Sequence, residues 1–137
     1  MTVTHRIVLA ALVAWLAGCA AAPSSAPAAR LDLALEKPSR DGKFRVALVP
    51  PRDGPAVNRI DSWSIRLMTP AGEPIRNGLV YLNGGMPEHG HGLPTRPRTY
   101  GEVAPGLYQV DGVKLSMTGW WEMLVAIQAN GTEDFAT

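Results

Sequence analysis

The chain has 137 residues, with 13 basic and 12 acidic side chains and one cysteine. This length gives room for one compact domain. The balanced charge and the lack of a basic run argue against a nucleic-acid partner, and a single cysteine excludes an internal disulfide or a cysteine-rich metal site. Such a domain must rely on its hydrophobic core for stability.

An apolar run at residues 7–17 has the length of the hydrophobic part of a signal peptide and is too short to span a bilayer. It ends in Leu-Ala-Gly-Cys at residues 16–19, which resembles the lipobox of bacterial lipoproteins. The resemblance implies that residues 1–18 are a cleaved signal peptide and that Cys19 becomes a diacylated N-terminus bound to the membrane. Ala20 after the cysteine favours, by the same resemblance, the outer membrane with the domain facing the periplasm. The alternative is an ordinary secretory signal in which Cys19 has no special role.

The next segment, residues 20–30, is made of small residues, contains two prolines and carries one charge. This composition is typical of a flexible linker. Together with Cys19 it predicts a tether over residues 19–30, followed by one domain over residues 31–137.

From residue 31 onward, apolar residues recur with a period of two, which indicates half-buried strands. Turn signals such as Pro50-Pro51 and Asn130-Gly131 separate the strands. The alternation predicts an all-β chain, an antiparallel immunoglobulin-like β-sandwich of six to seven strands. The expected apolar rows are residues 31–35, 44–48, 63–67, 79–82, 108–110, 113–117 and 121–127, with a last edge strand at residues 132–136.

Several large side chains have a structural role in this interpretation. Trp63 and Trp121 are expected at the centre of the core, whereas Trp120 lies on the opposite phase and should be partly exposed. Met123 shares the apolar phase of its strand and is expected to pack in the core. Tyr108, which follows Pro105-Gly106, is typical of the tyrosine corner of sandwich domains.

A glycine-rich segment at residues 84–92 contains His89 and His91, both histidines that remain after removal of the signal peptide. In an extended backbone these two imidazoles point to the same side, a spacing suited to a metal ion. Imidazole favours copper, zinc and nickel, and a nearby thioether would favour Cu(I). The alternative is a rigid loop in which the imidazoles form hydrogen bonds with backbone groups.

The same segment carries a resemblance to a known family. Met-Pro-Glu-His-Gly-His-Gly at residues 86–92, with residues 106–110 and 115–121, is similar to the YtkA-like and FixH-like group over roughly residues 42–128. These are small exported or membrane-anchored β-sandwich domains, linked with copper handling and with the assembly of copper-containing respiratory enzymes. The resemblance implies a copper ion as cofactor, a copper-containing membrane complex as partner, and His89, His91, Met86 and Met117 as the metal ligands.

An enzyme is not expected, because the chain has no recognisable Ser/His/Asp set and no phosphate-binding loop. Two functions remain open. The first is a lipid-anchored periplasmic protein that binds or delivers copper. The second is a non-catalytic envelope module that docks onto a membrane complex, with the His/Gly loop serving only the structure.

Overall fold

The computed structural model describes residues 30–137, of which Asp32–Thr137 form one compact unit. The expected signal peptide, the lipidated Cys19 and the tether up to residue 29 lie outside the described residues. Within residues 30–137, no helix is long and apolar enough to cross a membrane.

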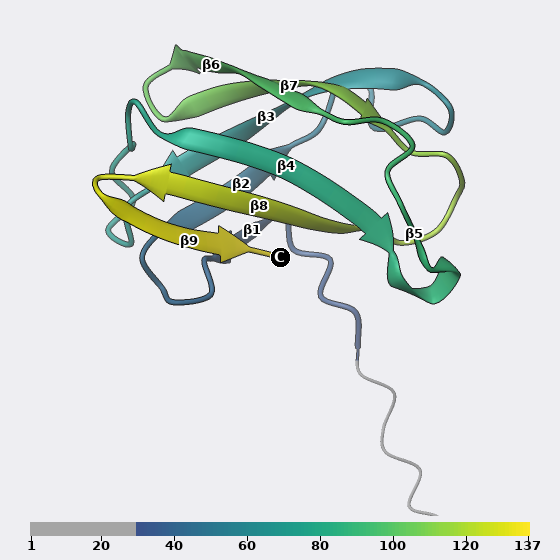
Figure 1. Cartoon of the computed structure of the whole chain (residues 1–137), viewed down its shortest axis with the longest axis horizontal. Coiled ribbons are helices and arrows are strands. Elements are labelled where there is room, and N and C mark those ends of the chain that lie inside the picture. The colour runs from purple at the N-terminus through teal and green to yellow at the C-terminus, as the bar shows by residue number, and fades with distance from the viewer. Residues whose placement is uncertain (1–29) are drawn as a thin grey trace, which may run out of the picture. The chain divides into compact units, whose positions relative to one another are not determined.

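The described residues form nine strands and one short 3-10 helix, η1 (Pro87–His89). One sheet has the order β1-β2-β3-β7-β6 and the other has the order β5-β4-β8-β9, and all neighbouring strands are antiparallel. Figure 1 shows the two sheets as stacked layers. The predicted antiparallel β-sandwich is therefore confirmed, although the described residues form nine strands where six to seven were predicted. The strands are β1 (Glu36–Pro38), β2 (Arg45–Val49), β3 (Ile60–Met68), β4 (Leu79–Met86), β5 (His91–Gly92), β6 (Arg98–Ala104), β7 (Leu107–Lys114), β8 (Glu122–Ala129) and β9 (Thr132–Ala136).

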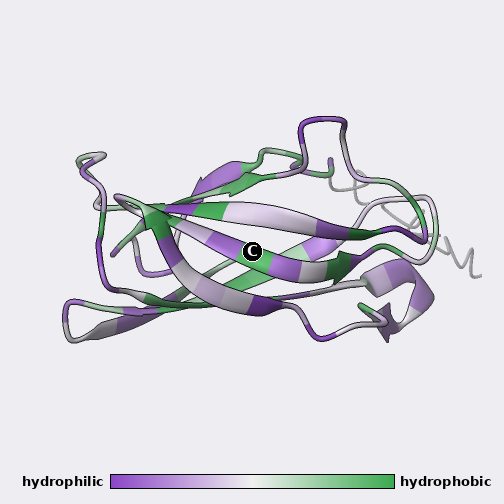
Figure 2. Cartoon of the chain, turned by 90° about the horizontal axis from the view of Figure 1, so that it is seen from above, coloured by the Kyte–Doolittle hydropathy of each residue, from purple (hydrophilic) through white to green (hydrophobic). Residues whose placement is uncertain are grey.

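The core lies between the two sheets and is built from alternate residues of the central strands. On β3, Trp63, Ile65 and Leu67 are buried while their neighbours face outward. The facing sheet contributes inward side chains from β4 and β8, Met123 among them, as expected. Figure 2 shows this alternation of hydrophobic and hydrophilic residues along the strands. Burial of these rows supplies the main stabilising free energy of the fold.

The apolar rows predicted at residues 108–110 and 113–117 do not form two strands. Residues 107–114 form the single strand β7, and a register shift opposite Asp61 and Ser62 absorbs one extra residue. That residue is Gly112, whose φ of +89° is a conformation that L side chains rarely adopt. The bulge reverses the inward phase of the strand, so Val110 and Val113 are both buried.

The strand predicted over residues 31–35 is wrong. Its leucines are exposed, with Leu33 at 72%, and β1 begins only at Glu36. β1 pairs with β2, and the register places residues 31–33 beyond the end of that partner strand, where Pro50 and Pro51 follow. Because proline has no N–H donor, the ladder ends there whatever the apolar pattern of residues 31–35.

The aromatic residues divide between core and periphery. Trp63 is 6% exposed and lies in the core as predicted, and Trp120 is half-buried. Trp121 is also only half-buried and packs against the margin of the core, so its predicted place at the centre is wrong. It precedes the first residue of β8, and its ring turns toward the loop before that strand.

Tyr108 fills the predicted corner position. Its hydroxyl donates to the carbonyl of Ile75 at 2.8 Å and accepts from the N–H of Gly78 at 2.9 Å. These bonds tie β7 to the connection between β3 and β4. The two sheets are thereby joined by a buried polar contact as well as by apolar packing.

Strands β6 and β4 lie beside each other where the two sheets meet. Two register shifts interrupt the pairing of β6 with β7, one of them beside Gly101 with its φ of +111°. The hydroxyl of Thr99 on β6 donates to the carbonyl of Val80 on β4. β6 therefore covers part of the edge of β4 that β5 leaves open.

Candidate functional site

The glycine-rich segment lies at the end of the sandwich where β4 passes through η1 into β5 (Figure 1). Two glycines allow this turn to pack closely. A Cβ at Gly84 would lie 2.6 Å from the sulfur of Met123, and a Cβ at Gly85 would lie 2.9 Å from the carbonyl oxygen of His91. Only glycine allows β4 to approach its neighbours this closely.

The two histidines approach each other by a different route from the one predicted. The backbone is not extended between them, because His89 ends the 3-10 helix and Gly90 adopts a left-handed conformation with φ +66°. The ring centroids of His89 and His91 are nonetheless 6.0 Å apart, and both residues are exposed. The turn, and not the period of a strand, brings the imidazoles to one side.

A close approach at this end joins the side chains of His91 and Met117, which are 26 positions apart in the chain. The Nε2 atom of His91 lies 3.3 Å from the sulfur of Met117. The Nδ1 atom of the same ring lies 3.2 Å from the carbonyl oxygen of Gly92. A neutral ring that carries its proton on Nδ1 donates to this carbonyl and leaves the Nε2 lone pair facing the sulfur, whereas the other tautomer donates from Nε2 to the sulfur.

Met86 lies on the inner side of this cluster and is 2% exposed. It is the register partner of His91 across β4 and β5, so the two side chains project from the same face of the sheet. A Cβ at Gly119 would lie 2.6 Å from the terminal methyl of Met86. The loop that carries Met117 therefore packs directly on Met86, and the four residues named as ligands from the resemblance gather at one end of the fold.

Two further residues at this end were missed as site residues. The ring of Trp121 contacts the ring of His91, and its Nε1–H donates to the carbonyl of Met117 at 3.2 Å. Glu122 lines an open hollow of about 180 Å³ together with Met86 and His91. The alternation of residues places Glu122 on the outward face of its strand, which does not indicate that it lies beside the histidines. The same alternation predicts that Trp121 lies in the core.

No group of three or more His, Cys, Asp or Glu side chains among residues 30–137 is arranged to hold a metal ion. A metal at this end of the sandwich would therefore need methionine sulfur in addition to the two imidazoles. Such a mixed set of imidazole and thioether ligands is soft and suits copper better than magnesium or calcium.

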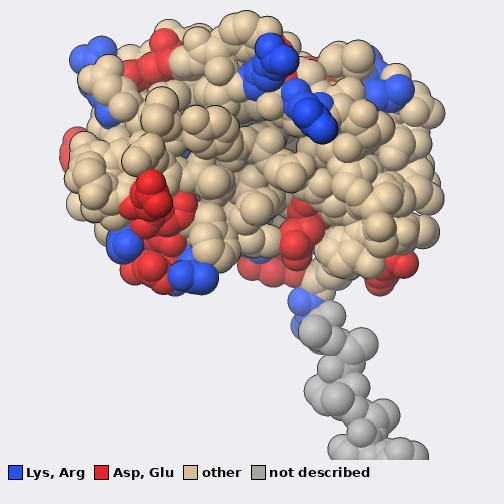
Figure 3. All heavy atoms as spheres, viewed as in Figure 1, with Lys and Arg blue, Asp and Glu red and all other residues tan. Residues whose placement is uncertain are grey.

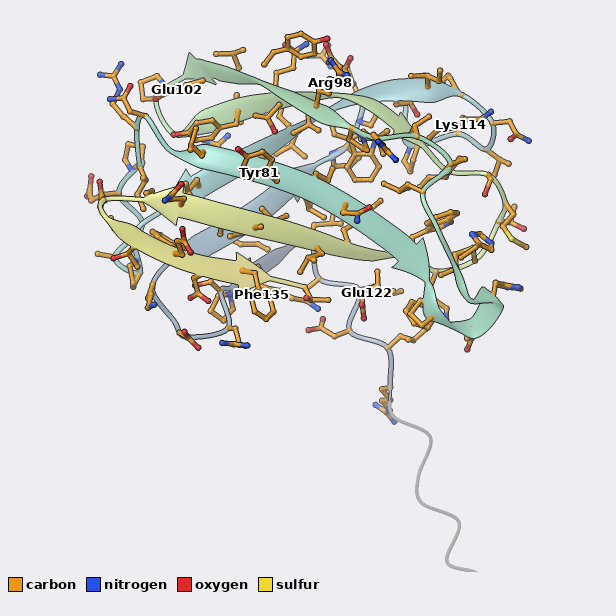
Figure 4. The ribbon with its side chains drawn as sticks, in the orientation of Figure 1. Tyr81, Arg98, Glu102, Lys114, Glu122 and Phe135 are labelled. Carbon is orange, nitrogen blue, oxygen red and sulfur yellow. The ribbon has the colours of Figure 1, made fainter. Side chains whose placement is uncertain are left out.

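A carboxylate with several hydrogen-bond partners, Glu102, lies at the opposite end of the sandwich. Backbone N–H groups of Gly106 and Asn77 donate to Glu102 and lower the pKa of its carboxyl, burial opposes them, and Arg76 adds to the lowering. Figure 4 shows Glu102 far from the β4–β5 turn. Its partners are groups of the fold itself, which indicates a structural role.

Comparison with known proteins adds one finding. No curated protein and no solved structure matches the chain. The YtkA-like family model matches residues 38–126, a span that includes both histidines, Met86, Met117 and Trp121. Since this span is more than half of the chain, the protein belongs to the YtkA-like family.

Proposed function

We propose that this protein binds Cu(I) at the end of its β-sandwich and delivers it to a copper-containing complex in the bacterial cell envelope. His91 and Met117 are the central ligands, and His89 and Met86 complete the donor set. The observation that supports the proposal best is the 3.3 Å approach of the Nε2 atom of His91 to the sulfur of Met117.

This approach has a simple electrostatic meaning. In the tautomer that donates from Nδ1 to Gly92, Nε2 offers a lone pair, and the thioether sulfur of Met117 offers another. A metal ion beside both atoms would accept both lone pairs. Metal bonds of about 2.0 Å to nitrogen and about 2.3 Å to sulfur place two ligands of one tetrahedral centre roughly this far apart.

The sulfur ligands favour copper in its reduced state. Thioethers are soft ligands that favour Cu(I), whereas structural zinc sites are built from Cys, His and carboxylate ligands. Met86 adds a second sulfur from the buried side of the turn. The chemistry that the metal supplies is reversible coordination, and the role of this chain is to hold and release it.

Exposure of the imidazoles supports a delivery function. His89 and His91 are exposed at a tip of the molecule, beside an open hollow. A partner that offers its own soft ligands can therefore reach the ion from outside while Met86 holds it from within. The ion would pass between ligands without crossing the core.

Copper titration tests the proposal directly. The full-length chain, purified in mild detergent, is titrated anaerobically with Cu(I) against a chromogenic chelator, and one ion per chain is expected. Met117→Leu and a His89→Ala/His91→Ala double variant should weaken binding by at least about tenfold, since each removes a ligand worth more than about 1.4 kcal/mol. Affinity should also fall at acidic pH, because protons compete with the metal for imidazole nitrogen.

Met68→Leu is the matched control. Met68 ends β3, where it pairs with Arg45 and Pro74. The control should bind as the unmodified chain does. Failure of the unmodified chain to take up Cu(I) would refute the proposed function.

The proposal includes membrane attachment through acylated Cys19. More than one acyl chain gives stable anchoring, since each buried methylene contributes about 0.8 kcal/mol. The protein should therefore fractionate with membranes, and Cys19→Ser should release it into the soluble fraction. A Cys19→Ser protein that still fractionated wholly with membranes would contradict lipid anchoring.

A second candidate function, docking onto a membrane complex, has one observation in its favour. The outer face of β4, β8 and β9 has a hollow of about 440 Å³ that Tyr81 and Phe135 border, and Tyr81 is 64% exposed. Figure 3 shows that charged side chains gather mainly toward the rim of this face, and Figure 4 shows both aromatic residues on it. Because docking needs no metal, the copper titration separates the two functions.

A further inference from the structure

Trp121 contacts both proposed central ligands, His91 after the β4–β5 turn and Met117 in the loop that faces it. The centroid of its ring lies 5.6 Å from that of His91, and the two planes meet at 66°, an edge-to-face arrangement. Its Nε1–H donates to the backbone carbonyl of Met117 at 3.2 Å. One half-buried side chain therefore restrains an imidazole on one strand and the backbone of the loop that faces it.

The two contacts of Trp121 restrain different parts of the site, the side chain of His91 and the backbone of the loop that carries Met117. The ring contact limits rotation of the His91 side chain, which is exposed and whose two ring nitrogens contact the Gly92 carbonyl and the Met117 sulfur. The hydrogen bond fixes residues 117–121 as a short loop, so that the sulfur of Met117 faces Nε2 of His91. Holding both donors before the ligand arrives removes an entropic cost of binding.

The adjacent tryptophan shows that these contacts are particular to position 121. Trp120 is also half-buried, yet its Nε1 has no hydrogen-bond partner within residues 30–137. No ring contact joins it to either histidine among the described residues. A role confined to packing the end of the sandwich would require neither the bond to Met117 nor the contact with His91.

We infer that Trp121 is the positioning residue of this site, which preorganises His91 and Met117 for a single soft metal ion. The inference rests on the proposed function, because it assumes that these two residues are ligands. Trp121 itself supplies no ligand atom. It acts by holding the imidazole and the thioether at the separation that the ion requires.

Two substitutions separate the two restraints. Trp121→Phe keeps an aromatic ring beside His91 and removes the donor to Met117, whereas Trp121→Leu removes both. Immobilising one side chain changes an affinity by about two- to tenfold, so Trp121→Phe should weaken Cu(I) binding by that factor. Trp121→Leu frees both ligands and should weaken binding by roughly ten- to a hundredfold. Trp120→Phe is the control and should bind as the unmodified chain does.

A double-mutant cycle distinguishes positioning from general support of the fold. In the full-length chain with Met117→Leu, the ligand that the hydrogen bond orients is absent, so Trp121→Phe should cause no further loss of Cu(I) affinity. Urea unfolding of each variant checks that the fold is retained. An equal loss in both backgrounds, or unchanged binding in Trp121→Phe and Trp121→Leu, would overturn the inference and leave the proposed function intact. An unmodified chain that binds no Cu(I) would instead refute the proposed function itself.

Discussion

Replacing Tyr108 by Phe removes one hydroxyl from the interior and leaves the ring in place. The side chain is 1% exposed, and its hydroxyl has two partners, the carbonyl of Ile75 and the N–H of Gly78. Ile75 is buried, so its carbonyl has no access to water and would cost about 1–3 kcal/mol when left without a donor. Gly78 is half-buried, which allows partial hydration of its N–H and a cost of about 1 kcal/mol.

These contributions predict that Tyr108→Phe lowers the free energy of unfolding by roughly 2–4 kcal/mol. Urea unfolding followed by tryptophan fluorescence measures the change, and the midpoint should fall by about 1–2 M for a slope of about 2 kcal/mol per molar urea, the middle of the range for small domains. Tyr81→Phe is the matched control, because its hydroxyl lies on an exposed side chain and the change should stay within about 0.5 kcal/mol. A Tyr108→Phe protein as stable as the unmodified chain would refute the reasoning.

The same tyrosine predicts a dependence on alkaline pH. Burial disfavours the phenolate and raises the pKa of Tyr108, although the N–H of Gly78 acts in the opposite direction. A raised pKa in the folded state contributes stability that is present below the unfolded value, about 10, and is lost as pH rises above it. The stability difference between the unmodified chain and Tyr108→Phe should therefore shrink above pH 10.

Two further predictions concern the core and a buried carboxylate. Trp63→Ala should lower the free energy of unfolding by roughly 3–5 kcal/mol, measured in urea, because it empties the space of a fully packed aromatic side chain. Burial of Asp134 disfavours its charge, but hydrogen bonds from Ser39 and from backbone N–H groups outweigh this and lower its pKa. Asp134→Asn should therefore be less stable at pH 7, and the difference should shrink as pH falls from the unfolded-state pKa of about 4 through the lowered pKa of the folded carboxyl. An equal difference at every pH would contradict this explanation.

The sequence predicted best those strands whose partners lie on both sides. β3 and β8 are flanked by strands and buried on one face, so their alternation could be read directly. β6 had no such row, because an edge strand with Arg98 and Tyr100 exposed and with two bulges has no regular period. Residues 31–33 show the converse, since a regular period forms no strand where the opposing residues include Pro50 and Pro51, which have no N–H donor.

The sequence also predicted only some of the residues of the candidate site. The pair His89 and His91 could be recognised from local spacing, although the turn that brings them together is not the extended strand that the spacing suggested. Met117 is distant in the sequence, and only the family resemblance associated it with the turn. Trp121 was missed because the period of two assigns a residue to a face without revealing which loop it touches beyond the strand.

The margins of the two sheets determine how copies of this protein behave when crowded. β1 has three residues and β5 has two, which is too short to template a strand from another molecule. β6 is longer, but its two bulges prevent continuous pairing with an incoming strand, and the hydroxyl of Thr99 already occupies a carbonyl of β4. The fourth edge strand, β9, is regular, but the carbonyls of Phe135 and Glu133 on it already accept from the backbone N–H of Arg40 and the ammonium of Lys43. All four edges are therefore short, bulged or partly occupied, which disfavours edge-to-edge pairing of sheets from different copies.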